Sequence, residues 1–105
     1  MALGVGLAGA IRMALQPAVH IVIDAEGRAS LRDGWGRSRP LPDTVHIAAG
    51  GRPRVLLEND ADRAHVVGLF RAPARGSAEY ALPGPGSYTG RCTVHRRAEV
   101  TFLVR

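Results

Sequence analysis

The stretch PGPGSYTGRCTVHRRAEVTFLV, Pro83 to Val104, decides the fold and the main functional hypothesis. A Pro-Gly turn precedes the segment Ser87–Cys92, and the segment Glu99–Arg105 follows a short polar loop. The second segment alternates apolar and polar residues, as a half-buried strand does. The stretch therefore predicts two strands whose connection holds the single cysteine, Cys92, and a histidine three residues later, His95.

Upstream of this stretch, short apolar segments alternate with Gly, Pro and Asp turns at intervals too short for long helices. The connection Leu31–Pro42 reads as irregular. Seven to eight short strands with regular turn signals predict an all-β fold, an antiparallel β-sandwich or small barrel. The further predicted strands are Val19–Asp24, Thr44–Gly51, Arg54–Asp60, His65–Phe70 and Ala78–Leu82.

Composition limits the classes of partner. The chain has 105 residues, a length that fits one domain, and its 46% apolar and 22% charged residues are typical of a folded protein. The net charge is +5, which favours an acidic partner. The basic residues are scattered and only 5% of residues are aromatic, so a base-stacking surface for nucleic acid is not indicated.

The N-terminal segment differs from the rest of the chain. Its apolar run Ala2–Ile11 is too short to span a bilayer, which needs about 20 residues, and no basic region precedes it. We interpret residues 1–17 as an apolar tail or the remnant of a signal or anchor, with a frayed, partly helical tail as the alternative. Residues 18–105 then form the domain.

Three residues form a candidate metal-ligand set. Cys92 and His95 share one loop, and His65 begins another predicted strand after a polar loop. Two imidazoles and one thiolate at one end of a β-sandwich make the trigonal ligand set of mononuclear electron-transfer copper sites. The alternative for a lone cysteine beside a strand is a small buried apolar residue.

Three segments together resemble the cupredoxin family of blue copper proteins, over roughly Val19 to Arg105. RPLPDTVHIAAGGRPRVLLEND is similar to the family's Pro-rich entry, strand, turn and strand ending in Asn, here Asn59. AHVVGLF resembles the segment with the first histidine ligand, and PGPGSYTGRCTVH resembles the Cys-x-x-His ligand loop. The resemblance implies a Greek-key β-sandwich, copper held by His65, Cys92 and His95, one-electron transfer, and an extracytoplasmic location, either periplasmic, secreted or membrane-anchored.

The chain departs from the family pattern at two positions. The usual axial methionine is replaced by Val100, and no methionine follows Met13. A fourth ligand is then the Glu99 carboxylate, the Ala64 carbonyl or water, or the site has three ligands. The Asn that often follows the first histidine is Val66 here, so the hydrogen bond that joins the two ligand loops must come from elsewhere or is absent.

The remaining polar residues have simpler interpretations. His20 and His46 alternate with apolar strand residues and are expected on an outer face, and Asp60, Asp62 and Arg63 read as a solvated turn. Arg96 and Arg97 are either exposed loop charges or a docking surface for an acidic redox partner. An enzyme is not indicated, because nothing in the sequence orients Cys92 as a nucleophile. The alternative to an electron carrier is a cupredoxin-like binding, structural or copper-delivery module without redox copper, and a membrane is expected as partner only through the N-terminal anchor.

Overall fold

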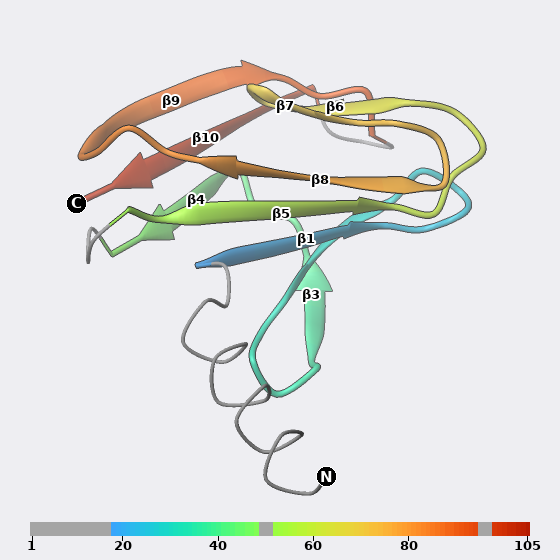
Figure 1. Ribbon diagram of the computed structural model, residues 1–105, viewed down its shortest axis with the longest axis horizontal. Coiled ribbons are helices and arrows are strands. Elements are labelled where there is room, and N and C mark those ends of the chain that lie inside the picture. Colours follow the sequence, from blue (N-terminus) through green and yellow to red (C-terminus); the bar gives the residue numbers. More distant parts are fainter. Residues whose placement is uncertain (1–17, 49–51, 95–97) are drawn as a thin grey trace, which may run out of the picture.

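The computed structural model describes residues 18–48, 52–94 and 98–105, which contain ten strands and no helix (Figure 1). No helix in these ranges is long and apolar enough to cross a membrane. The all-β prediction is confirmed. The predicted N-terminal tail, residues 1–17, lies outside the described residues.

Five strands form the larger sheet, in the order β3-β2-β1-β5-β8. Their bounds are β1 Val19–Ile23, β2 Ala29–Arg32, β3 Ser38–Pro40, β5 Arg54–Asn59 and β8 Gly76–Ala81. The neighbours β1 and β5 are parallel, whereas the other pairs are antiparallel. Between β1 and β5 the chain passes through three other strands, which gives it the length that a parallel return requires.

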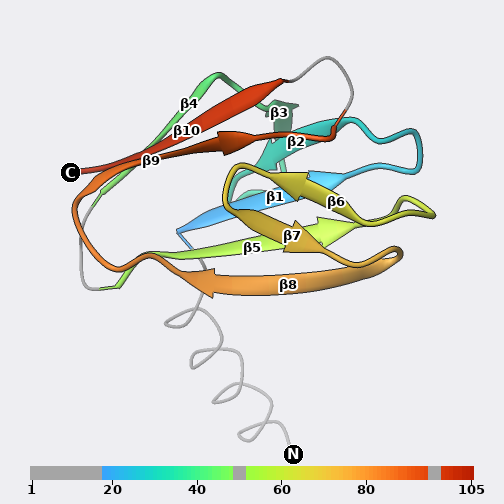
Figure 2. The ribbon, with the colours of Figure 1, turned by 90° about the horizontal axis from the view of Figure 1, so that it is seen from above.

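A three-stranded sheet has the order β4-β10-β9, and a separate hairpin joins β6 to β7. The strands are β4 Thr44–Ile47, β9 Gly86–Arg91 and β10 Glu99–Val104, with β6 His65–Val67 and β7 Phe70–Ala72 in the hairpin. Strands β10 and β4 are parallel. In Figure 2 the hairpin lies between β9 and β8, and both β6–β9 and β7–β8 are in contact.

One apolar core joins these elements. Alternate residues of β5 and β10 are buried, which follows from the two-residue period of a strand with one covered face. The ring of Phe70 in the hairpin packs against two other rings: its centroid lies 5.1 Å from that of Tyr80 and 5.0 Å from that of Phe102. The hairpin therefore packs against strands of both sheets. The buried side chains of β1, β4, β5 and β10 in this core are Val19, Ile21, Ile23, Val45, Ile47, Val55, Leu57, Val100, Phe102 and Val104.

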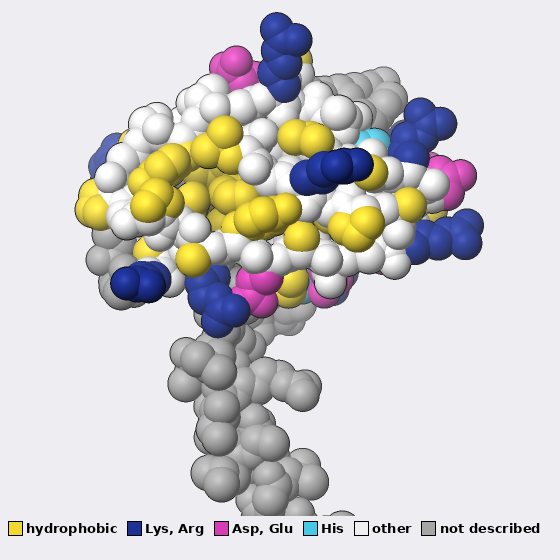
Figure 3. All heavy atoms as spheres, turned by 45° about the horizontal axis from the view of Figure 1, so that its top comes forward, with side chains coloured by type: hydrophobic (Ala, Val, Ile, Leu, Met, Phe, Trp, Pro, Cys, Tyr) yellow, Lys and Arg dark blue, Asp and Glu magenta, His cyan; other side chains and the backbone are white. Residues whose placement is uncertain are grey.

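The outer edges of the two sheets leave part of this apolar interior accessible. Strand β8 is the edge of the five-stranded sheet and β9 the edge of the three-stranded sheet. Tyr80 of β8 and Tyr88 of β9 are half-buried and pack against the core. On the face seen in Figure 3, apolar side chains gather in a shallow hollow with arginines around its margin.

Three sequence predictions about the strands are corrected by the structure. The sheets are mixed rather than antiparallel, because β1 pairs with β5 and β4 with β10 in parallel. The predicted strand His65–Phe70 is divided by a turn at Gly68, whose φ is +64°, into β6 and β7. The connection Leu31–Pro42 is not irregular but contains part of β2 and all of β3. The described residues therefore hold ten strands instead of seven to eight.

The two turns that flank β2 have the same sequence pattern and the same hydrogen bonds. DAEGR, Asp24–Arg28, joins β1 to β2, and DGWGR, Asp33–Arg37, joins β2 to β3. In each turn the Asp Oδ1 accepts two backbone N–H bonds of 2.9–3.0 Å, from the residues two and four positions later. The Gly of each turn has a φ near +80°, where a side chain would be strained. An Asp-x-x-Gly-Arg turn is thus used twice, once at each end of β2.

Candidate metal centre

His65, the first residue of β6, is held in a buried position at one end of the molecule. Its exposed fraction is 7%, so the residue is largely shielded from solvent. The loop that leads to it runs from the end of β5, and Asp60, Asp62 and Arg63 in this loop are exposed, as the solvated-turn prediction requires.

The buried amide of Asn59 fixes this loop. Its Nδ2 donates to the carbonyl oxygens of Arg63 at 2.8 Å and Pro73 at 3.0 Å, with a longer contact to Ala72 at 3.4 Å. Its Oδ1 accepts the Ala61 N–H at 3.0 Å. The side chain is 1% exposed, so these bonds replace water entirely. Asn59 therefore sets the path of the chain into His65.

Thr93 joins the His65 strand to the segment that carries Cys92. The Thr93 hydroxyl oxygen accepts the Val66 N–H at 2.9 Å and lies 2.9 Å from Nδ1 of His65. The Thr93 N–H donates to the Val66 carbonyl at 2.9 Å, and one residue further a β-bridge pairs Val67 with Cys92. The hydrogen bond between the two candidate ligand segments, which the Val66 side chain cannot make, is thus made by the Thr93 hydroxyl.

The hydrogen bond to Thr93 decides which nitrogen of His65 can bind a metal. If Nδ1 carries the proton, it donates to Thr93 and Nε2 keeps its lone pair; if Thr93 donates, Nε2 carries the proton. The Nε2 edge of the ring borders the first Asp-x-x-Gly-Arg turn: a Cβ on Gly27 would lie 3.5 Å from Nε2. A pocket of about 340 Å³ lies here, lined by Ala25, Glu26, Gly27, Ala61, Asp62, Arg63, His65 and Thr93.

Cys92 is half-buried and packs against the apolar core. Its N–H donates to the carbonyl oxygen of Ala98, the residue before β10, at 2.9 Å. The predicted ligand His95 and the predicted docking residues Arg96 and Arg97 lie between Cys92 and Ala98 in the sequence and outside the described residues. The structure therefore places two of the three predicted ligands, His65 and Cys92, on adjoining segments, and Cys92 is not among the residues that line the pocket at the Nε2 edge of His65.

The two residues considered for the fourth position lie elsewhere. Val100 is 1% exposed in β10, opposite Gly90, and its side chain packs in the core beside Gly68. Glu99 is exposed and lines a pocket with Asp43, Thr44, Ala98 and Thr101, none of which lines the pocket at His65. The described geometry brings neither residue to His65.

His20 and His46 are on outer faces of the sheets, as predicted. His46 is exposed, and His20 has its Nε2 3.2 Å from Glu58 Oε1, a close contact that does not have hydrogen-bond geometry. Among the residues that the structure describes, no three His, Cys, Asp or Glu side chains converge on one point. His65 is the histidine that adjoins the Cys92 segment.

Thr93 and Gly27 are the residues of this region that sequence reasoning missed. The position of Thr93 directly after Cys92 is the one signal that was available, since the neighbour of a ligand often orients another ligand. Nothing local to Gly27 indicates contact with His65. Comparison of the chain with protein-family models and with curated proteins finds no match.

Proposed function

We propose that the protein binds one copper ion through His65, Cys92 and His95 and carries single electrons, on a Greek-key, cupredoxin-like β-sandwich. The observation that carries the proposal is the Thr93 contact, which ties the imidazole of His65 to the residue after Cys92. His95 follows Thr93 by two positions in the same short loop. The three donors thus come from two segments that are already joined.

The donor set fits copper better than the alternatives. A thiolate favours Cu(I), and imidazole suits both Cu(I) and Cu(II), so together they tolerate the exchange of one electron. Structural zinc normally takes four protein ligands, and this set has three. Bound copper would supply the one-electron redox couple, while the protein holds the ligands in place.

Rigidity is the contribution of the fold. His65 is fixed by the β6 pairing, by Thr93 and by the Asn59 loop, and Cys92 is fixed by its bridge to Val67. Ligands that do not rearrange between oxidation states lower the energy needed for each electron transfer. The packing of Val100 in the core favours a site without a strong axial donor, for which we expect a raised reduction potential.

The partner and the location follow from the resemblance and the charge. The net charge of +5 suits an acidic redox partner, with Arg96 and Arg97 beside His95 as the docking residues. We place the protein outside the cytoplasm, as the resemblance implies. The apolar tail before β1 is consistent with export or anchoring.

Titration of the apoprotein with Cu(II) tests the proposal through visible absorption and electron paramagnetic resonance. A strong band that saturates at one equivalent indicates a short copper–thiolate bond. Cys92→Ser should abolish the band and His65→Ala should weaken and shift it, whereas His46→Ala, on an exposed histidine, should leave it unchanged. An equal weak response from all four proteins would favour the second candidate, a binding, structural or copper-delivery module.

A further inference from the structure

The turn after β2 and the edge strand β3 extend from the larger sheet, whereas Ala29 and Leu31 of β2 pack against the core. Every residue from 32 to 40 is exposed, and β3 is an edge strand. At the tip of the β2–β3 hairpin stands Trp35, the single tryptophan of the chain, which is 89% exposed. The apolar surface of this indole is left in water, and tryptophan is enriched where an apolar body and a polar tip meet an interface.

The conformation of the turn does not require a tryptophan. The equivalent turn at the other end of β2 has Glu26 at the position of Trp35, with the same Asp hydrogen bonds and the same glycine conformation. The turn is held by backbone N–H bonds to the Asp33 carboxylate and by bonds between backbone groups. Among the described residues, none of these bonds involves the indole of Trp35. The conformation of the turn therefore does not account for the tryptophan at position 35.

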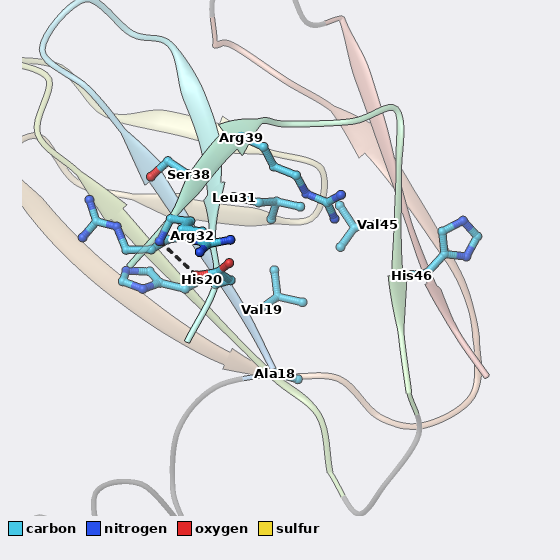
Figure 4. A pocket seen from close by; sticks show the side chains of 11 residues that line it. Ala18, Val19, His20, Leu31, Arg32, Ser38, Arg39, Val45 and His46 are labelled. Atoms are coloured by element: carbon cyan, nitrogen blue, oxygen red, sulfur yellow. Dashed lines mark hydrogen bonds between the residues drawn. The ribbon is translucent and has the colours of Figure 1, made fainter. Parts of the chain in front are cut away.

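The hairpin is positively charged around this indole. Arg32, Arg37 and Arg39 are all exposed, and the one acidic residue, Asp33, has its Oδ1 bonded to the Trp35 and Arg37 N–H groups. Beside the hairpin lies a groove of about 580 Å³ whose lining includes apolar Val19, Leu31 and Val45 and these three arginines. Figure 4 shows Arg39 extending across this groove toward Val45.

The tip of the hairpin lies at the end of the molecule where β1 begins. Strand β2 runs antiparallel to β1, with Arg32 opposite His20, so the turn after β2 is beside Ala18. The apolar run Ala2–Ile11 precedes β1 in the sequence. Gly27, in the turn at the opposite end of β2, is the residue that meets His65. Trp35 and the candidate metal centre are therefore at opposite ends of β2.

From these observations we infer that the hairpin tip docks on the surface of an anionic phospholipid bilayer. The indole of Trp35 enters the interfacial region, where tryptophan is enriched in membrane proteins. The guanidinium groups of Arg32, Arg37 and Arg39 meet the lipid phosphates. Docking in this way turns His65 and Cys92 away from the membrane and leaves them accessible to a partner in solution.

A bilayer fits this surface better than an acidic protein does. Protein interfaces concentrate their energy in residues surrounded by other contacts that exclude water. Trp35 instead stands alone between Gly34 and Gly36 on a protruding turn, with no large apolar neighbour on the hairpin. A protruding indole with flanking arginines needs no matching pocket when the partner is the headgroup layer of a membrane.

Because Trp35 is the only tryptophan, its fluorescence reports on the hairpin alone. The full-length chain is mixed with phosphatidylcholine vesicles, with and without phosphatidylglycerol, and with vesicles of brominated lipid. We expect a blue shift with the anionic vesicles, a small shift or none with the neutral ones, and quenching by the brominated lipid. Vesicle binding without a change in Trp35 emission would assign the attachment to the N-terminal tail and would overturn the inference. The absence of any vesicle binding would overturn it as well.

Separate variants test the contribution of the three arginines and the contribution of Trp35 to vesicle binding. Arg32→Gln, Arg37→Gln and Arg39→Gln together should lower affinity for the anionic vesicles on the order of 100-fold, since each arginine contributes about fivefold. The control changes Arg28, Arg71 and Arg75, exposed arginines outside the hairpin, to Gln. Trp35→Glu, which copies the first turn, should lower sedimentation with vesicles several-fold while the fold is retained by circular dichroism. Equal losses in both arginine sets, or a Trp35 shift caused by polyglutamate and not by vesicles, would contradict the bilayer as partner.

Discussion

Nδ1 of His65 lies 2.9 Å from the hydroxyl oxygen of Thr93, which also accepts the N–H of Val66. One hydroxyl thus orients the ring of a candidate ligand and joins its strand to the segment of a second ligand. Groups that orient metal ligands in this way typically change metal affinity 10–100-fold when removed. The contact makes Thr93 the first residue to test after the ligands themselves.

We expect Thr93→Val to lower copper affinity by about 10–100-fold, because the isosteric side chain keeps the packing and loses both hydrogen bonds. Affinity is measured by competition with a copper chelator. Thr89→Val is the matched control, since the Thr89 hydroxyl bonds Thr101 on an exposed part of β9 and β10 at 2.7 Å. Equal affinities in the two variants would exclude Thr93 as an orienting residue.

Asn59→Ala should destabilise the apoprotein by about 2–4 kcal/mol. The change leaves the buried Ala61 N–H without its partner, which costs about 1–3 kcal/mol, and removes one bond each from the part-buried Arg63 and Pro73 carbonyls, which costs less. Urea unfolding measures the loss. Glu58→Ala, at the adjacent position on the opposite face, removes only a partly exposed charge contact with His20 and should cost about 1 kcal/mol or less.

Copper affinity should fall as the pH is lowered. The metal binds deprotonated thiolate and neutral imidazole, so each proton that binding displaces weakens the apparent affinity by about tenfold per pH unit of acidification. Chelator competition across a pH series gives the slope. Cys92→Ser should flatten it at neutral pH, because the thiol proton is then no longer displaced; an unchanged slope would mean that the thiolate is not a ligand.

The strands that bury one face were predictable, and the hairpin was not. Segments such as Arg54–Asn59 and Glu99–Val104 show the two-residue alternation because one face meets the core. The residues from 32 to 40 are exposed on both faces, so no alternation exists to read. The repeat of Asp-x-x-Gly-Arg at Asp24 and Asp33 is the signal that would have found the second turn.

The pairing between strands that are distant in the chain could not be predicted from the sequence. Whether β1 lies next to β5 in parallel depends on which strands the chain passes through in the other sheet, a property of the whole core. Spacing favoured His65 as a partner of the Cys92 loop, and the Val66–Thr93 bonds connect the two segments. The proximity of Gly27 to His65 brings together two segments that are far apart in the sequence, and no residue pattern around either position predicts it.

The crossing of Gly68 and Gly90 sets the distance between the β6–β7 hairpin and β9. A Cβ on Gly90 would lie 2.5 Å from both the carbonyl carbon and the oxygen of Gly68, closer than backbone atoms allow. The Gly68 N–H also donates to the Arg91 carbonyl at 3.0 Å, one residue before Cys92. The close approach of two glycines therefore holds β6 against the strand that leads into the candidate site.

Gly90→Ala should destabilise the protein by about 3 kcal/mol, because the backbone of the hairpin must shift to accept the methyl group. The same shift moves Val67 from Cys92, so copper affinity should fall as well, although the substitution touches neither ligand. Gly34→Ala is the control: nothing lies within 4 Å of its Cβ, and its stability should stay within about 0.5 kcal/mol of the parent. Urea unfolding and copper titration of both variants measure the two effects. If Gly90→Ala lost stability but kept full copper affinity, the Val67–Cys92 bridge would not position the thiolate, and the site would depend on Thr93 alone.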